Sequence, residues 1–144
     1  MENFGSGRWQ NLRATLESDS ALAAAYLFGS HARGTNTRMS DIDLAVLFQS
    51  SINESCYFEL RLEYIARIMG ILHTERVDLV VLNNVPLHLA YEIVSSSILL
   101  LDRDPGQRAA FEADRIGRFL DFKPFLAVQV LAIKTHLSKG TYFD

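Results

Sequence analysis

Residues 28–48, FGSHARGTNTRMSDIDLAVLF, decide the fold. In this stretch a Gly-Ser pair, Gly29 and Ser30, is followed after ten residues by an Asp-Ile-Asp, with its acids at Asp41 and Asp43. The alternation from Asp41 onward predicts a strand on which both acids leave the same face. Two carboxylates this close raise each other's pKa unless a cation offsets their repulsion. The spacing therefore indicates a divalent metal site beside a sheet.

Apolar runs and helical periodicities on both sides of this stretch predict the remaining elements. Strands are predicted over residues 23–28, 41–48, 76–82 and 98–101, and helices over 7–18, 54–73, 86–96 and 107–138, with an interruption near Pro124. The helix over 54–73 is expected to bury its most regular apolar face, formed by Phe58, Leu62, Ile65, Met69 and Leu72. This order predicts an α/β (α+β) fold, in which helices flank a mixed sheet of about four strands and C-terminal helices follow.

A third acid, Asp78, lies inside the strand predicted over residues 76–82, RVDLVVL. Asp41, Asp43 and Asp78 could therefore converge on one face of the sheet, although Asp78 could also be a sheet-edge acid or an ion-pair partner of Arg76. Mg²⁺ suits such a group, because it prefers one or two carboxylates together with waters and substrate phosphates. Two Mg²⁺ ions about 4 Å apart can clamp both oxygens of a phosphoryl displacement.

The loop before the acids carries groups that suit a phosphate. Glycine lets the backbone approach a phosphate closely, and the Ser30 hydroxyl can bond its oxygens. Arg33 and Arg38 could neutralise further phosphate charge. Ser40 could also contact the nucleotide, or it could simply cap the turn into the strand. His31, in the same loop, is expected to be solvated.

These motifs resemble those of a known family. Gly29-Ser30, the ten-residue spacer and the Asp41/Asp43 pair resemble the nucleotidyltransferase motif of the DNA polymerase β superfamily. The fuller run GSHARG…SDIDLAVL is similar to its minimal nucleotidyltransferase (MNT) branch, whose short prokaryotic members are often antitoxin partners of HEPN-domain ribonuclease toxins. The resemblance spans about residues 22–101. It implies that Asp41 and Asp43 bind Mg²⁺ and that Asp78 helps to hold the metal and orients the nucleophile.

The resemblance also implies an activity. Ser30 would contact the triphosphate of ATP, and AMP would pass to a hydroxyl, expected to be that of a tyrosine, on a partner HEPN toxin, which would thereby be neutralised. One alternative is a small-molecule acceptor such as an aminoglycoside, although about 40 residues after Leu101 leave little room for a second acceptor-binding region. Another is a non-catalytic antitoxin that blocks its toxin by contact alone.

The sequence contains its own control for the motif. Gly5-Ser6 is also followed after ten residues by two acids, Glu17 and Asp19. No strand precedes this pair, and the acids fall at the end of a helical pattern, where positions two apart do not share a face. We interpret this second match as chance.

Composition limits the remaining possibilities. A chain of 144 residues predicts a single nucleotidyltransferase domain over 1–144, with a catalytic core at about 22–101 and a C-terminal helical region at about 107–139. A net charge of −3 gives no reason to expect direct nucleic-acid binding. One cysteine, no apolar run of about 20 residues and no signal-peptide pattern favour the cytoplasm and no membrane association. The apolar stretch at 119–137 could complete the core or present a face to a partner or to a second copy.

Overall fold

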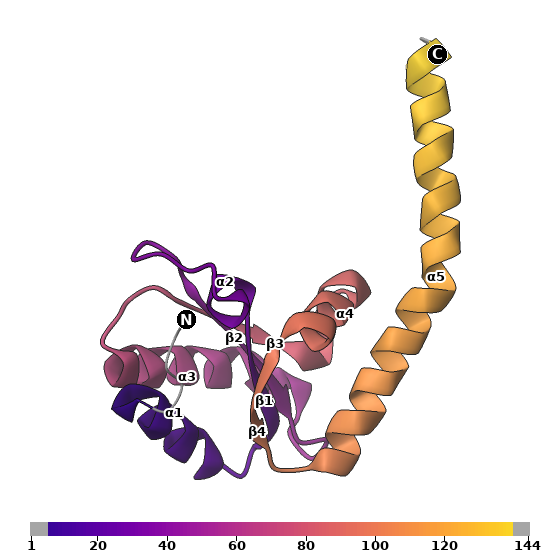
Figure 1. Ribbon diagram of the computed structural model, residues 1–144. Helices are drawn as coiled ribbons and strands as arrows, with labels where there is room; N and C mark the ends of the chain where they lie inside the picture. Colours follow the sequence, from indigo (N-terminus) through magenta and orange to yellow (C-terminus); the bar gives the residue numbers. More distant parts are fainter. Residues whose placement is uncertain (1–5, 140–144) are drawn as a thin grey trace.

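The computed structural model describes residues 6–139 of the chain. Its elements in chain order are α1 (Gly7–Glu17), β1 (Leu22–Phe28), α2 (Gly29–Arg33), β2 (Ile42–Phe48), the 3₁₀ turn η1 (Glu54–Cys56), α3 (Tyr57–Leu72), β3 (Val77–Val81), the 3₁₀ turn η2 (Leu82–Asn84), α4 (Leu87–Ser96), β4 (Ile98–Asp102) and α5 (Pro105–Lys139) (Figure 1). The predicted order of helices and strands is confirmed as far as β4, and one helix follows where two were predicted. The polar loop after β1 begins with the single short helix α2.

The four strands form one mixed sheet in the order β3-β2-β1-β4. The central strand β1 is antiparallel to both of its neighbours, whereas β2 and β3 are parallel. Parallel neighbours need a crossover, and α3 provides it between β2 and β3. Strands β2 and β3 therefore begin at the same edge of the sheet, and residues at their N-terminal ends lie side by side.

Helices cover both faces of the sheet. The larger core cluster joins Trp9, Leu12 and Leu16 of α1 and Tyr64, Ile68 and Leu72 of α3 to one face, which includes Leu44, Val46 and Phe48 of β2. On the other face, Ala45 and Leu47 of β2 pack with Ile93 of α4 and Phe111 of α5. Because side chains alternate along a strand, Asp43 belongs to the face of Ala45 and Leu47. The acids therefore lie on the side that α4 and α5 cover.

The predicted buried face of α3 is wrong in part. Phe58 and Leu62 are exposed, and the buried residues are Tyr64, Ile68 and Leu72. Two overlapping apolar stripes run along this helix, and Tyr64 selects one of them because its hydroxyl donates to the Asp19 carboxylate. A hydrogen-bonded phenol can be buried at little cost, so the stripe that contains Tyr64 packs into the core.

The predicted interruption of the C-terminal helix is also wrong. Residues 105–139 form one helix, with Pro124 inside it. Proline removes one backbone hydrogen bond and bends a helix without necessarily ending it. Figure 1 shows α5 changing direction near its middle. Its first half packs against α4, whereas every residue from 121 to 135 is exposed, so the interpretation of this stretch as core is wrong for those residues.

Among residues 6–139, no helix combines the length and the apolar character needed to cross a bilayer.

Candidate active site

The acids meet where β2 and β3 begin. Asp43 of β2 is the register partner of Asp78 of β3, and it also pairs with Phe28 at the end of β1. Adjacent strands lie about 4.8 Å apart, so these backbones are immediate neighbours. Asp41 lies just before β2. The structure therefore brings all three predicted carboxylates to one edge of the sheet.

The pKa of Asp43 reflects the proximity of the other two acids. Burial raises the pKa of the Asp43 carboxyl, and the charges of Asp78 and Asp41 raise it further. His31 and Arg33 oppose the shift by lowering this pKa. Asp43 is thus a half-buried acid facing two others, and a cation beside it would relieve the repulsion.

Gly29 fits closely against this acid. It adopts a left-handed conformation with φ +72°, and a Cβ at this position would overlap the Asp43 carboxylate. Glycine is therefore required both by the turn from β1 into α2 and by the space that Asp43 occupies. The half-buried Ser30 follows directly. The predicted Gly-Ser turn thus lies against the acid pair.

The carboxylates fit Mg²⁺ as partial ligands. Within the described part of the chain, no group of three or more His, Cys, Asp or Glu side chains is arranged to hold a metal ion by itself. Mg²⁺ does not require such a cage, because it usually keeps several waters and takes one or two carboxylates with substrate phosphates. Asp41 and Asp43 supply two carboxylates of this kind, and the nucleotide would supply the phosphate oxygens.

Asp78 has a partner that the sequence did not indicate. Arg61 of α3 places Nη2 3.5 Å from Oδ1 of Asp78, and its Nε donates to the carbonyl oxygen of Leu79 at 2.7 Å. The suggested pairing with Arg76 is wrong, since the Arg76 guanidinium donates instead to the carbonyl oxygen of Met39 at 2.9 Å. Because Arg61 lies on a different element, seventeen residues before Asp78, no local pattern could have identified it.

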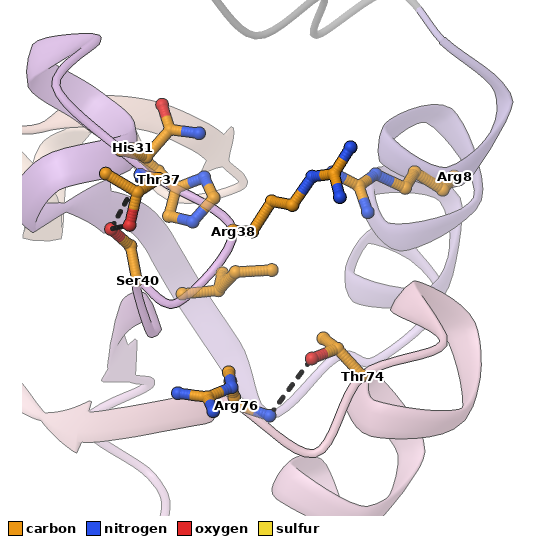
Figure 2. A pocket seen from close by; sticks show the side chains of 9 residues that line it. Arg8, His31, Thr37, Arg38, Ser40, Thr74 and Arg76 are labelled. Carbon is orange, nitrogen blue, oxygen red and sulfur yellow. Dashed lines mark hydrogen bonds between the residues drawn. The ribbon is translucent and has the colours of Figure 1, made fainter.

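A basic cavity of about 480 Å³ lies between α1, the α2–β2 loop and the segment before β3. It is lined by Arg8, His31, Asn36, Thr37, Arg38, Ser40, Ile42, Thr74 and Arg76. Figure 2 shows Arg8 of α1 and Arg38 of the α2–β2 loop extending toward each other across the cavity. The lining residues include three arginines and no carboxylate, so the cavity favours an anion. Sequence reasoning missed Arg8 and Arg76, which come from segments far from the motif.

The remaining predicted loop residues divide between the acids and the cavity. Arg33 lowers the pKa of Asp43, whereas Arg38 and Ser40 line the cavity. The Ser40 hydroxyl also accepts a hydrogen bond from the Thr37 backbone at 2.8 Å and therefore closes the turn before β2. His31 is buried, so its expected solvation is wrong. It connects the two regions, because it lines the cavity and lowers the pKa of Asp43.

The second Gly-Ser match has a structural explanation. Gly5 lies outside the described residues, while Ser6 precedes α1. Asp19 accepts hydrogen bonds from the Tyr64 hydroxyl and from the Ala21 backbone. It therefore stabilises the packing of α1 against α3.

Residues 10–106 match the model of the family described as "Polymerase beta, Nucleotidyltransferase". The chain belongs to this family. The match includes β1 to β4, the Gly-Ser turn and the three acids. It makes this nucleotidyltransferase a member of the superfamily that the motif suggested. A search of curated protein sequences found no match.

Several solved structures share the fold. A toxin–antitoxin crystal structure with AMP-PNP is similar over 90% of this chain and 99% of its own, with 22% sequence identity and a TM-score of 0.69. The structure of a tri-AMPylated Shewanella oneidensis HEPN toxin in complex with MNT antitoxin matches 87% of this chain and 98% of its own, with 20% identity and a TM-score of 0.62. The nucleotidyltransferase and these solved chains therefore have the same overall fold.

Proposed function

We propose that this nucleotidyltransferase transfers AMP from ATP to a hydroxyl of a partner protein, using Mg²⁺. The observation that carries the proposal is the register of Asp43 with Asp78, directly against the Gly29 turn. A triphosphate at this turn would meet two carboxylates that repel each other without a cation. Mg²⁺, when bound, would neutralise developing charge on the phosphate oxygens.

Each residue then has a defined task. Asp41 and Asp43 hold the metal, and Gly29 and Ser30 offer backbone and hydroxyl groups to the phosphates. Arg33 and Arg38 offset further phosphate charge. These groups would work mainly by position and electrostatics, which is the usual source of rate in phosphoryl transfer.

Asp78 is the acid best suited to the acceptor. As the acceptor oxygen bonds to the α-phosphorus, the bond to pyrophosphate breaks and the hydroxyl proton must leave. Asp78 is the exposed residue of the edge strand β3 and the register partner of Asp43. Its carboxylate can take that proton. Arg61, 3.5 Å away, holds the carboxylate at the strand edge.

We further propose that the acceptor is a HEPN-domain toxin, modified on a tyrosine and thereby neutralised. Two observations support this. The family match shows a nucleotidyltransferase, and structures of similar fold are described as complexes of MNT antitoxin with HEPN toxin, one of them tri-AMPylated.

The direct test is co-expression with the product of the adjacent gene, followed by intact mass measurement of that product. We expect a gain of one or more AMP units with the wild-type chain and none with Asp43→Asn. Asp19→Asn is the matched control, because it changes an acid of the second Gly-Ser match and keeps an oxygen for Tyr64. A partner whose mass is unchanged with every nucleotide would overturn the proposal, and a modified aminoglycoside in its place would favour the small-molecule alternative.

A further inference from the structure

The second half of α5 leaves the rest of the protein as an apolar arm. We define the arm as residues 120–135, in which every position after Leu120 is exposed. Its large apolar side chains, between 36% and 65% exposed, are Leu120, Phe122, Phe125, Leu126, Val128, Val130, Leu131 and Ile133. Figure 1 shows the arm extending past α4 and α2. So much apolar surface on a monomer marks a binding site.

The arm points in the direction of the active-site edge of the sheet. Strand β4 starts at that edge, because Ile98 pairs with Leu27 next to the position where Phe28 pairs with Asp43. Strand β4 then runs to the opposite edge, and α5 turns back along the same sheet face, where Phe111 packs with Ala45 and Leu47. This is the face of Asp43. Helix α5 therefore runs in the direction of the edge that carries the acids, and its second half extends beyond α4 (Figure 1).

The apolar seam that attaches α5 continues into the arm. Phe119, whose ring stacks on Tyr91 of α4 with centroids 4.0 Å apart, is the last anchored aromatic residue of α5. The seam then passes through Phe122, Leu126, Val130 and Ile133, at steps of three, four, four and three residues. Residues at these steps lie along one side of a helix. The side of α5 that packs against α4 in its first half therefore continues along the arm, where no described element covers it.

A second copy of this chain is a poor fit for the arm. The seam beyond Phe119 spans only about two heptads, whereas three or four are needed to indicate a coiled coil. A two-stranded coiled coil would also leave Phe125, Val128 and Leu131 in water, because it covers only the seam. A helix that is apolar all round is normally buried inside a larger structure. An apolar groove on a folded partner would cover both sides.

We propose that the arm inserts into an apolar groove of the acceptor protein and so brings the acceptor hydroxyl to Asp43 and Asp78. This inference rests on the proposed function for the identity of the partner. Docking at the arm makes the transfer step effectively intramolecular. The arm therefore sets the affinity for the protein acceptor and has no part in binding ATP.

The test uses the full chain with one substitution on the seam. Val130→Glu places a carboxylate on the seam, and Thr135→Glu places one on the opposite side of the helix as a control. Both side chains are exposed, so neither change should alter the melting temperature. Calorimetric titration with the product of the adjacent gene, without nucleotide, should show Val130→Glu weakening binding at least about tenfold and Thr135→Glu by less than about twofold.

Kinetics separate docking from chemistry. Val130→Glu should raise the KM for the protein acceptor while kcat at saturating acceptor and the affinity for ATP stay at wild-type values.

Equal binding of the two variants, or no binding of the wild-type chain, would overturn the docking surface. A chain that dimerises in sedimentation and becomes monomeric with Val130→Glu would assign the arm to a second copy instead. Binding to anionic lipid vesicles that Val130→Glu abolishes, without binding to the protein, would assign it to a membrane surface.

The two proposals can fail separately. A complex that depends on Val130 but shows no gain in mass would overturn the adenylyl transfer and not the docking surface. Conversely, a wild-type rate of modification by Val130→Glu at low acceptor concentration would overturn the docking surface and leave the transfer intact.

Discussion

The first residue of α2, Gly29, and the residue that follows the helix, Gly34, have nearly the same backbone conformation but different surroundings. Gly29 has φ +72° and Gly34 has φ +73°, and only at Gly29 would a Cβ meet another group, the carboxylate of Asp43. Alanine at either position should cost about 1–2 kcal/mol of folding free energy, because L residues are strained in this region. Gly29→Ala should in addition slow nucleotidyl transfer about a hundredfold, since it displaces a reacting group.

The comparison of these two variants is the measurement. Urea denaturation should give a loss for Gly29→Ala that is at least as large as that for Gly34→Ala, because a Cβ at Gly29 also overlaps Asp43. Transfer from labelled ATP should fail only in Gly29→Ala. Equal activity in the two variants would mean that the contact between Gly29 and Asp43 has no catalytic importance.

Asp43 should limit the stability of the protein at neutral pH. Burial, Asp78 and Asp41 raise the pKa of this carboxyl above its unfolded value. A raised folded-state pKa adds stability that is complete below the unfolded pKa and is lost as the pH rises through the folded one. Asp43→Asn avoids that loss, so its melting temperature should exceed that of the wild type at pH 7 and match it near pH 3.

The same variant should lose function. Transfer should fall at least about a hundredfold, because a charge that stabilises the transition state is gone. Mg²⁺ with ATP should raise the melting temperature of the wild type, since a ligand stabilises the state that binds it, and should have little effect on Asp43→Asn. The exposed Asp121→Asn is the control and should change neither property. A variant that is less stable than the wild type at pH 7 would refute the electrostatic account.

At the residue scale, the sequence predicted the groups that one strand and one turn place together. Asp41, Asp43 and Gly29 lie within fifteen residues, and the period of a strand suffices to place both acids on one face. Arg61 and Arg8 could not be predicted, because they reach the site from α3 and α1 through the packing of whole elements. The burial of His31 depends on the same packing.

At the scale of elements, Tyr26 links the central strand to α5. Its hydroxyl donates to Oε1 of Glu112 at 2.8 Å, and Nη1 of Arg108 lies 3.1 Å from the other oxygen of that carboxylate. Burial and the bond to Glu112 raise the pKa of the Tyr26 phenol. Tyr26→Phe should therefore cost about 1–2 kcal/mol, since a hydrogen bond to a charged group is lost while Arg108 still pairs with the acid.

Chemical denaturation measures this cost, and Glu112→Gln provides the comparison. The glutamine keeps an acceptor oxygen for Tyr26, so its effect should be the smaller of the two. A loss in Tyr26→Phe below about 0.3 kcal/mol would show that apolar packing alone holds α5 on the sheet.

Periodicity predicted which elements form but not always which side they bury. In α3 two apolar stripes overlap, and a hydrogen bond between Tyr64 and Asp19, 45 residues apart in sequence, decides between them. In α5, Pro124 indicated a break, yet a single proline removes only one backbone hydrogen bond and the helix continues with a bend. Hydrophobicity in residues 119–137 likewise could not distinguish a helix buried in the core from a helix whose apolar side chains bind another protein.

At the scale of the whole molecule, the topology of the sheet determines both where the acids meet and in which direction the arm extends. A mixed sheet in the order β3-β2-β1-β4 starts β2, β3 and β4 at one edge, and α5 runs in the direction of that edge after β4. The sequence predicted the number of strands and the family, but strand order and direction come from long-range pairing. The direction in which the arm extends follows from that topology.

This topology predicts an uneven distribution of local stability, measurable by hydrogen exchange. Strand β1 is central and its residues from Leu22 to Leu27 are buried, so its amides should open only with global unfolding. Residues 121–135 have helical hydrogen bonds but no tertiary cover among the described elements, and a helix of this length is marginal in water. Their amides should exchange at least about a thousandfold faster than those of β1. Adding the acceptor protein should slow exchange in the arm while β1 is unchanged. Protection of the arm that grows with the concentration of the chain alone would instead identify a second copy as the cover.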